Sequence, residues 1–220
     1  MFTGIVAQTG VLLDVERRGA GVSIKVETAG DFLIRENVRL GDSIACNGVC
    51  LTVTSLNGNV FSADVSYETM EHTCFGDYTR GTVLNLEAAV TPATHLGGHI
   101  VQGHVDAVGV IASVVKSSEA VDVTVSAPHE LMRYIAYKGS VTVDGISLTV
   151  NDVLEDAFRL TLIPHTRGRT NFDSWKAGHR VNLEADVLAR YLERLMSFSE
   201  KEKSKESGAL SLKTLIENGF

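Results

Sequence analysis

The apolar positions of the chain fall into short runs that alternate with polar residues or are bounded by glycine, which is the pattern of half-buried β-strands. The dipeptide Asn57-Gly58 separates two such runs as a hairpin turn does. The first half predicts strands at 3–13, 21–27, 43–47, 50–55, 60–65 and 82–89. The second half repeats their order at 100–112, 120–126, 140–144, 147–153, 158–163 and 180–185.

Helical periodicity is limited to three places. Residues 31–33, with Asp31 as a cap, and residues 129–134 each predict a short helical turn. A third, longer helix over 187–197 has one apolar face, made by Val187, Leu188, Tyr191, Leu192, Leu195 and Met196. This face packs either on the chain's own barrel or on a partner chain. The charged segment 198–220 that follows is expected to be a mobile tail.

The two halves are copies of one another. Residues 48–53 (GVCLTV) match 145–150 (GISLTV) at an offset of 97, and 85–88 match 182–185 at the same offset. At the front of each half, Gly4 and Val6 match Gly103 and Val105 at an offset of 99. Self-similarity of this kind is the signature of a repeated structural unit.

Six strands leave two exposed edges unless the sheet closes, so each half is predicted to be a small barrel. The predicted fold class is all-β, with two tandem six-stranded antiparallel Greek-key β-barrels from an internal duplication, followed by a C-terminal α-helix. The predicted domains are 1–97, 98–186, the helix 187–197 and the tail 198–220. A Gly- and Pro-bearing connection at 91–98 joins the barrels.

Composition removes several classes of function. The net charge is −7, and the basic residues do not gather into a stripe, which argues against a nucleic-acid partner. No apolar run approaches the roughly 20 residues of a membrane helix, and the N-terminus has no basic region of a signal peptide. If Cys46 and Cys50 lay on one regular strand, they would be roughly 13 Å apart, too far for a disulfide. These features predict a cytoplasmic protein with free thiols.

The repeated motif is the first candidate for chemistry. Gly48 and Gly145 allow a ligand to approach the backbone, and each is followed by a nucleophile-capable side chain, Cys50 or Ser147. Backbone amides and hydroxyls that alternate along an extended segment suit a flat heterocycle, and two similar pockets suit two similar ligands. The alternative is that the motif only forms a barrel corner.

Histidine supplies the acid and base candidates. His95, His99 and His104 could be read as a metal cluster, but the glycines among them oppose a helix and no carboxylate lies between them, so no metal site is predicted. His104, beside Gly103 in the predicted first strand of the second half, is the favoured functional residue, although a lone histidine on a strand is more often structural. Cys46 and Cys74 are expected in the core.

Taken together, 1–6 (MFTGIV), 47–53 (NGVCLTV), 97–99 (GGH), 103–105 (GHV), 137–139 (YKG) and 144–150 (DGISLTV) closely resemble riboflavin synthase. The resemblance covers residues 1 to about 196. It implies a transferase that dismutates two molecules of 6,7-dimethyl-8-ribityllumazine into riboflavin and 5-amino-6-ribitylaminouracil, without a metal or redox cofactor. It also implies a homotrimer that uses the helix 187–197, and association with lumazine synthase is a further expectation. One departure is Val49-Cys50, where some members have two adjacent cysteines.

The resemblance also carries over site residues. The first pocket would use Gly4, Ile5, Val6, Cys50, Leu51, Thr52, Asp64, Val65, Ser66, Tyr67, Glu68 and Thr69. The second would use Gly103, His104, Val105, Lys138, Ser147, Leu148, Thr149, Thr161, Leu162, Ile163, Pro164, His165 and Thr166. Ser43, Asp144 and Asp186 match family positions near the sites.

The reaction sets two chemical demands. A proton must leave the 7-methyl group of one lumazine, for which His104 is the candidate, with Thr149 or backbone amides stabilising the charge. The other lumazine must be activated at C7 by a nucleophile, for which Ser147, Cys50, water or a ribityl hydroxyl are all open. The rival functions are a non-catalytic lumazine or flavin carrier and the flavin barrel of a reductase. The latter would need a dinucleotide-binding domain that the chain lacks.

Overall fold

The computed structural model describes residues 1–19, 21–117, 120–162 and 168–207, and for residues 18 and 199–207 only the backbone. It contains two closed antiparallel barrels of six strands each, as predicted. The first barrel consists of β1 Gln8–Arg18, β2 Gly21–Thr28, β3 Ser43–Cys46, β4 Val49–Asn57, β5 Val60–Val65 and β6 Val83–Ala88. The second consists of β7 Ala107–Lys116, β8 Val121–Ser126, β9 Ser140–Val143, β10 Ile146–Val153, β11 Ala157–Leu162 and β12 Arg180–Ala185.

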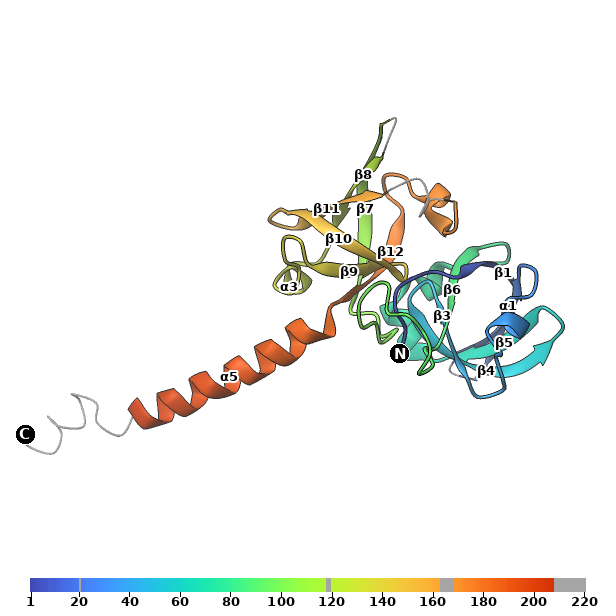
Figure 1. Cartoon of the computed structure of the whole chain (residues 1–220), viewed down its shortest axis with the longest axis horizontal. Helices are drawn as coiled ribbons and strands as arrows, with labels where there is room; N and C mark the ends of the chain where they lie inside the picture. Colours follow the sequence, from blue (N-terminus) through green and yellow to red (C-terminus); the bar gives the residue numbers. More distant parts are fainter. Residues whose placement is uncertain (20, 118–119, 163–167, 208–220) are drawn as a thin grey trace, which may run out of the picture. The chain divides into compact units, whose positions relative to one another are not determined.

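The barrels share one topology (Figure 1). Their strand orders are β1-β2-β5-β4-β3-β6 and β7-β8-β11-β10-β9-β12, so each equivalent strand has the same neighbours. In each barrel, three consecutive strands form a meander, β3-β4-β5 in the first and β9-β10-β11 in the second. The strand before the meander, β2 or β8, pairs with its last strand, which is the Greek-key arrangement. The irregularities repeat as well: the bulge at Leu12/Asp14 recurs at Ile111/Ser113. Bulges bend strands, so the copies curve at the same points.

Short helices lie between the strands. The predicted turns are present as α1 Phe32–Arg35 and α3 His129–Met132, although the Asp31 side chain makes no capping hydrogen bond. The sequence did not predict α2 Tyr67–His72 or the 3₁₀ turns η1 Cys74–Asp77 and η2 Asn171–Ser174. The helix α2 begins where the Ser66 hydroxyl accepts a hydrogen bond from the Thr69 N–H, a local cap.

Two predicted strands begin too early. Residues 3–6 and 100–105 precede β1 and β7 and lie outside both, so His104 is not on a strand. Each segment has a valine packed on a barrel core, Val6 on the second and Val105 on the first. That environment produces the same pattern as a strand.

The C-terminal helix is longer than predicted. The helix α5 Val187–Ser207 continues through charged residues that were expected to be part of a mobile tail, and residues 208–220 lie outside the described chain. Residues 1–186 form one compact unit and the segment from Val187 onward another, so the division at residue 97 stays a prediction. No helix in the described ranges has the length and hydropathy to span a membrane.

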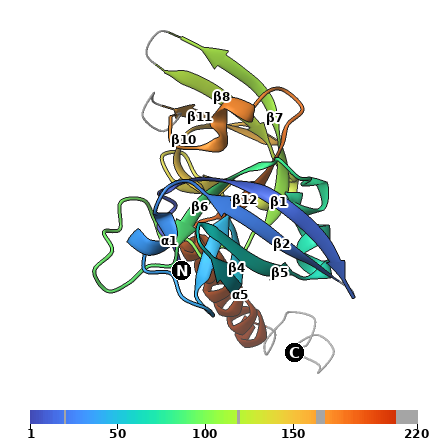
Figure 2. The ribbon, with the colours of Figure 1, turned by 90° about the vertical axis from the view of Figure 1, so that its right-hand side faces the viewer.

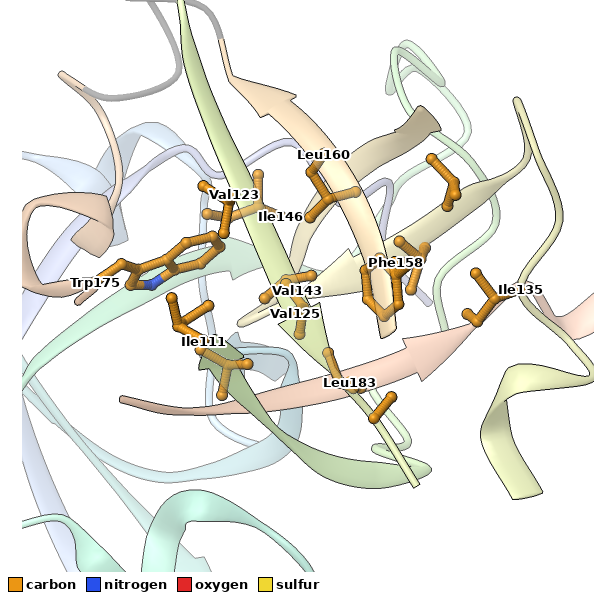
Figure 3. Packing of buried hydrophobic residues seen from close by; sticks show 14 of the residues in the cluster. Ile111, Val123, Val125, Ile135, Val143, Ile146, Phe158, Leu160, Trp175 and Leu183 are labelled. Carbon is orange, nitrogen blue, oxygen red and sulfur yellow. The ribbon is translucent and has the colours of Figure 1, made fainter. Parts of the chain in front are cut away.

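Each barrel encloses its own core. In the second, the side chains of Phe158 and Leu160 on β11, Val143 on β9 and Leu183 on β12 point inward (Figure 3). The core of the first includes the fully buried Phe61. Figure 2 shows the neighbouring strands β1, β2, β5 and β4 of this barrel. Cys46 is fully buried in the first core, and Cys74 is buried too, as expected.

Buried amides join the barrels across an approximate two-fold relationship. The Asn85 side-chain amide donates to the Asp144 carbonyl (2.9 Å), and the equivalent Asn182 donates to the Asn47 carbonyl (2.8 Å). Asn171 bridges the two copies by donating to Asn47 Oδ1 and Asp144 Oδ2, both at 3.2 Å. Buried polar groups must be hydrogen-bonded, so this network fixes how the two barrels meet.

The repeated motif begins at this junction. Asn47 and Asp144 both have left-handed backbones, with φ of 45° and 48°. The glycines that follow lie back to back: a Cβ added at Gly48 would be 2.8 Å from Gly145 N, and one added at Gly145 would be 2.6 Å from Gly48 N. No other residue fits this contact.

Asp144 places a buried carboxyl group at the junction between the barrels. Burial raises its pKa to about 7, although hydrogen bonds from the Asn182 N–H and the Asn171 amide favour its ionised form. An acid whose pKa is higher in the folded state than its ordinary value near 3.9 binds a proton more tightly when folded. The stability that the protonated Asp144 contributes is therefore complete at low pH and is lost as the pH rises through about 7.

We expect Asp144→Asn to reduce the slope of stability against pH, while Glu87 and Glu184 keep part of it. In the wild type, this titration lowers the free energy of unfolding between about pH 4 and pH 7, and the amide cannot titrate. Urea denaturation across this range measures the slope. Asp14→Asn, at an exposed ion pair with Lys25, is the control and should keep the wild-type slope. Equal slopes for Asp144→Asn and the wild type would contradict the assignment.

Candidate functional site

The segments that precede the two barrels run antiparallel to each other. The Phe2 N–H donates to the Val101 carbonyl (2.7 Å) and the Val101 N–H donates to the Phe2 carbonyl (3.1 Å). Phe2 and Val101 are equivalent in the repeat at the offset of 99. The two segments therefore meet at the same approximate two-fold relationship as the amide network.

Each segment then docks on the barrel of the other half. The Gly4 carbonyl accepts a hydrogen bond from the Ser147 N–H (2.7 Å), and the Gly103 carbonyl accepts one from the Cys50 N–H (2.8 Å). Val6 belongs to the core of the second barrel, and Val105 packs against the core of the first. We call residues 1–7 and 100–106, which precede β1 and β7, the front segments. Each repeated motif is thus covered by the front segment of the opposite half.

Glycine is required where the segments cross the motifs. Gly4 and Gly103 have φ of 75° and 79°. A Cβ added at Gly4 would lie 2.6 Å from Ser147 Cβ, and one at Gly103 would lie 2.7 Å from Cys50 Cβ. Both the left-handed backbone and the close approach exclude a side chain.

Two glutamates at equivalent positions of the repeat, Glu87 and Glu184, bind backbone amides of the two segments. Glu87 accepts hydrogen bonds from the Thr3 N–H (2.6 Å) and the Gly4 N–H (2.9 Å). Glu184 accepts them from the Gln102 N–H (2.7 Å) and the Gly103 N–H (3.0 Å). Burial raises the pKa of both carboxyls, that of Glu184 to about 7.

A first cavity of about 690 Å³ opens beside Cys50. Its walls come from both halves: β4 and α2 supply one side, and the segment from Gly103 to β7 supplies the other. The lining residues are Val49, Cys50, Glu68, Thr69, Glu71, His72, Thr73, Gly103, His104, Val105, Asp106, Ala107, Val108 and Arg180. This volume is in the range of small-molecule sites.

A second, smaller cavity of about 130 Å³ lies beside Ser147. It is again formed by the motif of one half and the front segment of the other. The lining residues are Gly4, Ile5, Val6, Ile146, Ser147, Arg169 and Thr170. The predicted residues Ile163, Pro164, His165 and Thr166, which the repeat places next to Arg169, lie outside the described residues.

The predicted division of residues between the two pockets is therefore wrong in one respect. Gly4, Ile5 and Val6 line the cavity of Ser147 and not that of Cys50, while Gly103, His104 and Val105 line the cavity of Cys50. Sequence order suggested that each front segment serves its own half. The crossing of the segments at Phe2 and Val101 reverses this.

Other predicted residues do not line these two cavities. Leu51, Val65 and Leu162 are buried in the cores, and Ser43 and Tyr67 line separate depressions. The remaining ones are Thr52, Asp64, Ser66, Lys138, Leu148, Thr149, Thr161 and Asp186. Among them, Lys138 has a left-handed backbone (φ 62°) at the position where the first half has Gly41 (φ 87°). The left-handed backbone of Lys138 costs about 1–3 kcal/mol of folding free energy relative to a relaxed conformation.

Ser147 has a partner that the sequence does not indicate. His99 Nδ1 lies 2.7 Å from Ser147 Oγ, and His99 is buried, with Nε2 unpaired among the described residues. Burial lowers the pKa of His99 below its ordinary value of 6.5, and the carboxylate of Asp186 opposes this. The imidazole is therefore neutral at pH 7. Gly98 permits this approach, because a Cβ there would lie 2.1 Å from the Thr3 carbonyl.

His99 and His104 lie at different motifs. His104 is exposed and faces the Cys50 cavity, whereas His99 is bonded to Ser147. No group of three metal-ligating side chains occurs in the described part of the chain. All three cysteines are free thiols, and Cys50 is the one that reaches a cavity.

Both barrels match the family described as the lumazine binding domain, over residues 3–89 and 102–186. The two matched regions begin at the front segments and end with β6 and β12. The fold and the paired cavities thus define a protein of two lumazine-binding domains.

Similar sequences narrow this class. The chain is 44% identical to a riboflavin synthase of Photobacterium phosphoreum over 220 residues, 100% of this chain and 99% of that one. It is 38% identical to a riboflavin synthase of Bacillus subtilis, with both chains fully covered. It is 46% identical to a riboflavin synthase of Mycobacterium tuberculosis over 200 residues, 89% of this chain and 98% of that one. The chain belongs to the riboflavin synthase family.

Solved structures share the two-barrel fold at lower identity. LumP in complex with riboflavin superposes with a TM-score of 0.78 at 23% identity, covering 84% of this chain and 99% of LumP. LumP in complex with 6,7-dimethyl-8-(1'-D-ribityl) lumazine gives a TM-score of 0.75 at 22% identity with the same coverage.

The crossing of the front segments predicts which glycine controls which motif. Gly103→Ala should loosen the segment over Cys50 by about 1–3 kcal/mol and raise the alkylation rate of this thiol about fivefold or more. Gly4→Ala, the matched control at the equivalent position, should leave that rate near the wild-type value, since Gly4 covers Ser147. Mass spectrometry of the alkylated peptide measures the rate. The opposite ranking of the two variants would support the uncrossed arrangement.

Proposed function

We propose that the protein is a riboflavin synthase that converts two molecules of 6,7-dimethyl-8-ribityllumazine into riboflavin and 5-amino-6-(D-ribitylamino)uracil, the final step of riboflavin biosynthesis. The observation that carries this proposal is the pair of equivalent cavities, each built from a repeated motif and the front segment of the opposite half. A reaction whose donor and acceptor are the same compound needs two related pockets. The similarity to riboflavin synthases over the whole chain supports it.

The reaction balances without an oxidant or reductant, because one lumazine gains the four-carbon unit that the other loses. The protein must hold both molecules in a reactive orientation, remove a proton from one 7-methyl group and activate the other ring at C7. Fixing two reactants together supplies about 7–11 kcal/mol of the barrier in favourable cases. We therefore expect catalysis by this protein to depend strongly on the positioning of the two substrates.

Ser147 and His99 form the best-defined chemical pair. A neutral imidazole can accept the Ser147 proton through Nδ1, so the hydroxyl oxygen can add to C7 of a lumazine or bind its developing charge. The pair needs the tautomer with the proton on Nε2. The low pKa of the buried His99 keeps it available as a base at neutral pH.

Cys50 and His104 supply the chemistry of the first cavity. Both line it, so His104 is placed to assist removal of the 7-methyl proton from a lumazine bound there, and Cys50 is an alternative nucleophile. Thr149 is exposed on β10 two residues after Ser147 and is proposed as a hydrogen-bond donor. The predicted binding residues that line neither cavity remain candidates for contact with a substrate held between subunits.

The C-terminal helix and the cysteines bear on assembly and location. The helix α5 exposes Tyr191, Leu192, Leu195 and Met196, each by more than half of its surface, which supports a homotrimer joined through this face. A cytoplasmic location agrees with the three free thiols. Association with lumazine synthase stays a prediction.

The first experiment is to incubate the purified protein with 6,7-dimethyl-8-ribityllumazine and to follow riboflavin by absorbance and fluorescence. We expect half a mole of riboflavin for each mole of lumazine consumed. The second candidate function is a lumazine or flavin carrier, which the likeness to LumP favours. A bound chromophore with a shifted spectrum and no riboflavin would establish the carrier and contradict the enzyme.

His99→Asn tests the proposed base. Loss of the imidazole should lower kcat by about 100-fold or more, with a smaller change in KM. In the wild type, kcat should rise with pH through the lowered pKa of His99, below 6.5, and this acid limb should be absent in the variant. His129→Asn, at an exposed histidine that pairs with Asp156, is the control. Wild-type turnover and an unchanged acid limb in His99→Asn would exclude His99 from catalysis.

A further inference from the structure

The first cavity has an unbalanced set of charged groups. Glu68 and Glu71 face it from α2, and Asp106 faces it from the segment that leads into β7. Arg180, at the start of β12, is the one Lys or Arg among the lining residues, and its guanidinium is already paired with Asp77 of η1. The cavity therefore has an excess of negative charge at neutral pH.

The second cavity does not share this charge. In the repeat, Glu71 corresponds to Gly168, His72 to Arg169 and Asp106 to Ala7. Arg169 lines the second cavity, and none of its described lining residues is a carboxylate. The two copies have thus kept the same backbone arrangement around the motif while their polar linings differ in sign.

We propose that the first cavity selects an uncharged ribityl chain and rejects a ribityl chain that ends in a phosphate, and that Glu71 and Asp106 are the residues that determine this. The inference rests on the proposed function, because it takes the cavity as a site for a ribityl-bearing ring. We expect the second cavity to accept a ribityl chain with or without a phosphate.

The chemistry of the two chain ends explains the selection. A ribityl hydroxyl is a hydrogen-bond donor, and carboxylates are strong acceptors, so the acidic lining favours a neutral polyol. A phosphate monoester carries about −1.5 to −2 charges at pH 7 and offers mainly acceptor oxygens, so it meets repulsion and no donors from these groups. At a partly exposed site, one carboxylate near a phosphate is expected to weaken binding about tenfold.

Riboflavin and its 5'-phosphate, FMN, are the probes that differ only in this group. The full-length wild-type protein and the variant Glu71→Gln are titrated with each flavin, and quenching of flavin fluorescence gives the affinities and the number of sites per chain. Glu155→Gln is the matched control, because Glu155 is exposed in the turn between β10 and β11 and lines neither cavity. A second series at high salt tests the electrostatic origin.

In the wild type we expect riboflavin at two sites per chain and FMN at one. Glu71→Gln should raise the affinity of the first cavity for FMN about tenfold and change that for riboflavin by less than about threefold, and high salt should narrow the difference between the flavins. Equal binding of both flavins by the wild type would overturn the inference, as would a parallel change for both flavins in Glu71→Gln. A protein that forms riboflavin yet binds FMN and riboflavin alike, or binds neither, keeps the proposed function and loses this inference, whereas a protein that forms no riboflavin from the lumazine loses the proposed function.

Discussion

Two reciprocal hydrogen bonds organise the molecule. The carbonyl of Gly4 receives the amide of Ser147, and the carbonyl of Gly103 receives the amide of Cys50. Each bond takes a segment from one half of the chain and fixes it over the motif of the other. Because buried backbone groups must be paired, neither motif can be completed by its own half in this arrangement. Each motif is therefore completed by a segment from the other half of the chain.

The surrounding residues stabilise this crossed arrangement of the two segments. Glu87 and Glu184 bind the amides on the far side of the crossing segments, and the amide network of Asn47, Asn85 and Asn182 sets the distance between the barrels. The back-to-back contact of Gly48 and Gly145 then brings the two motifs together at their starting points. Burial of the carboxyls disfavours their ionised forms, so part of the folding free energy is used to hold this junction.

Duplication provides two sites, and divergence makes them unequal. The Ser147 site has a buried histidine within hydrogen-bonding distance, and the Cys50 site has an exposed histidine and an acidic lining. Such differences suit a reaction in which identical molecules play different parts. The common backbone recognises what the two substrates share, and the side chains that differ between the copies can distinguish their roles.

Much of this could be read from the sequence because the controlling signals are local or repeated. Alternation of apolar residues predicted the strands, turn residues such as Gly58 their connections, and the offset of 97 the two barrels and the paired motifs. The helix over 187–197 followed from its periodicity, but its continuation to Ser207 did not, because charged residues are compatible with both helix and tail. The crossing of the front segments could not be predicted, since either barrel offers an equivalent amide and only packing decides between them. The same reason hid the contact of His99 with Ser147, 48 residues further along the chain: a histidine acquires a partner through the tertiary fold, and nothing in its sequence neighbourhood names that partner.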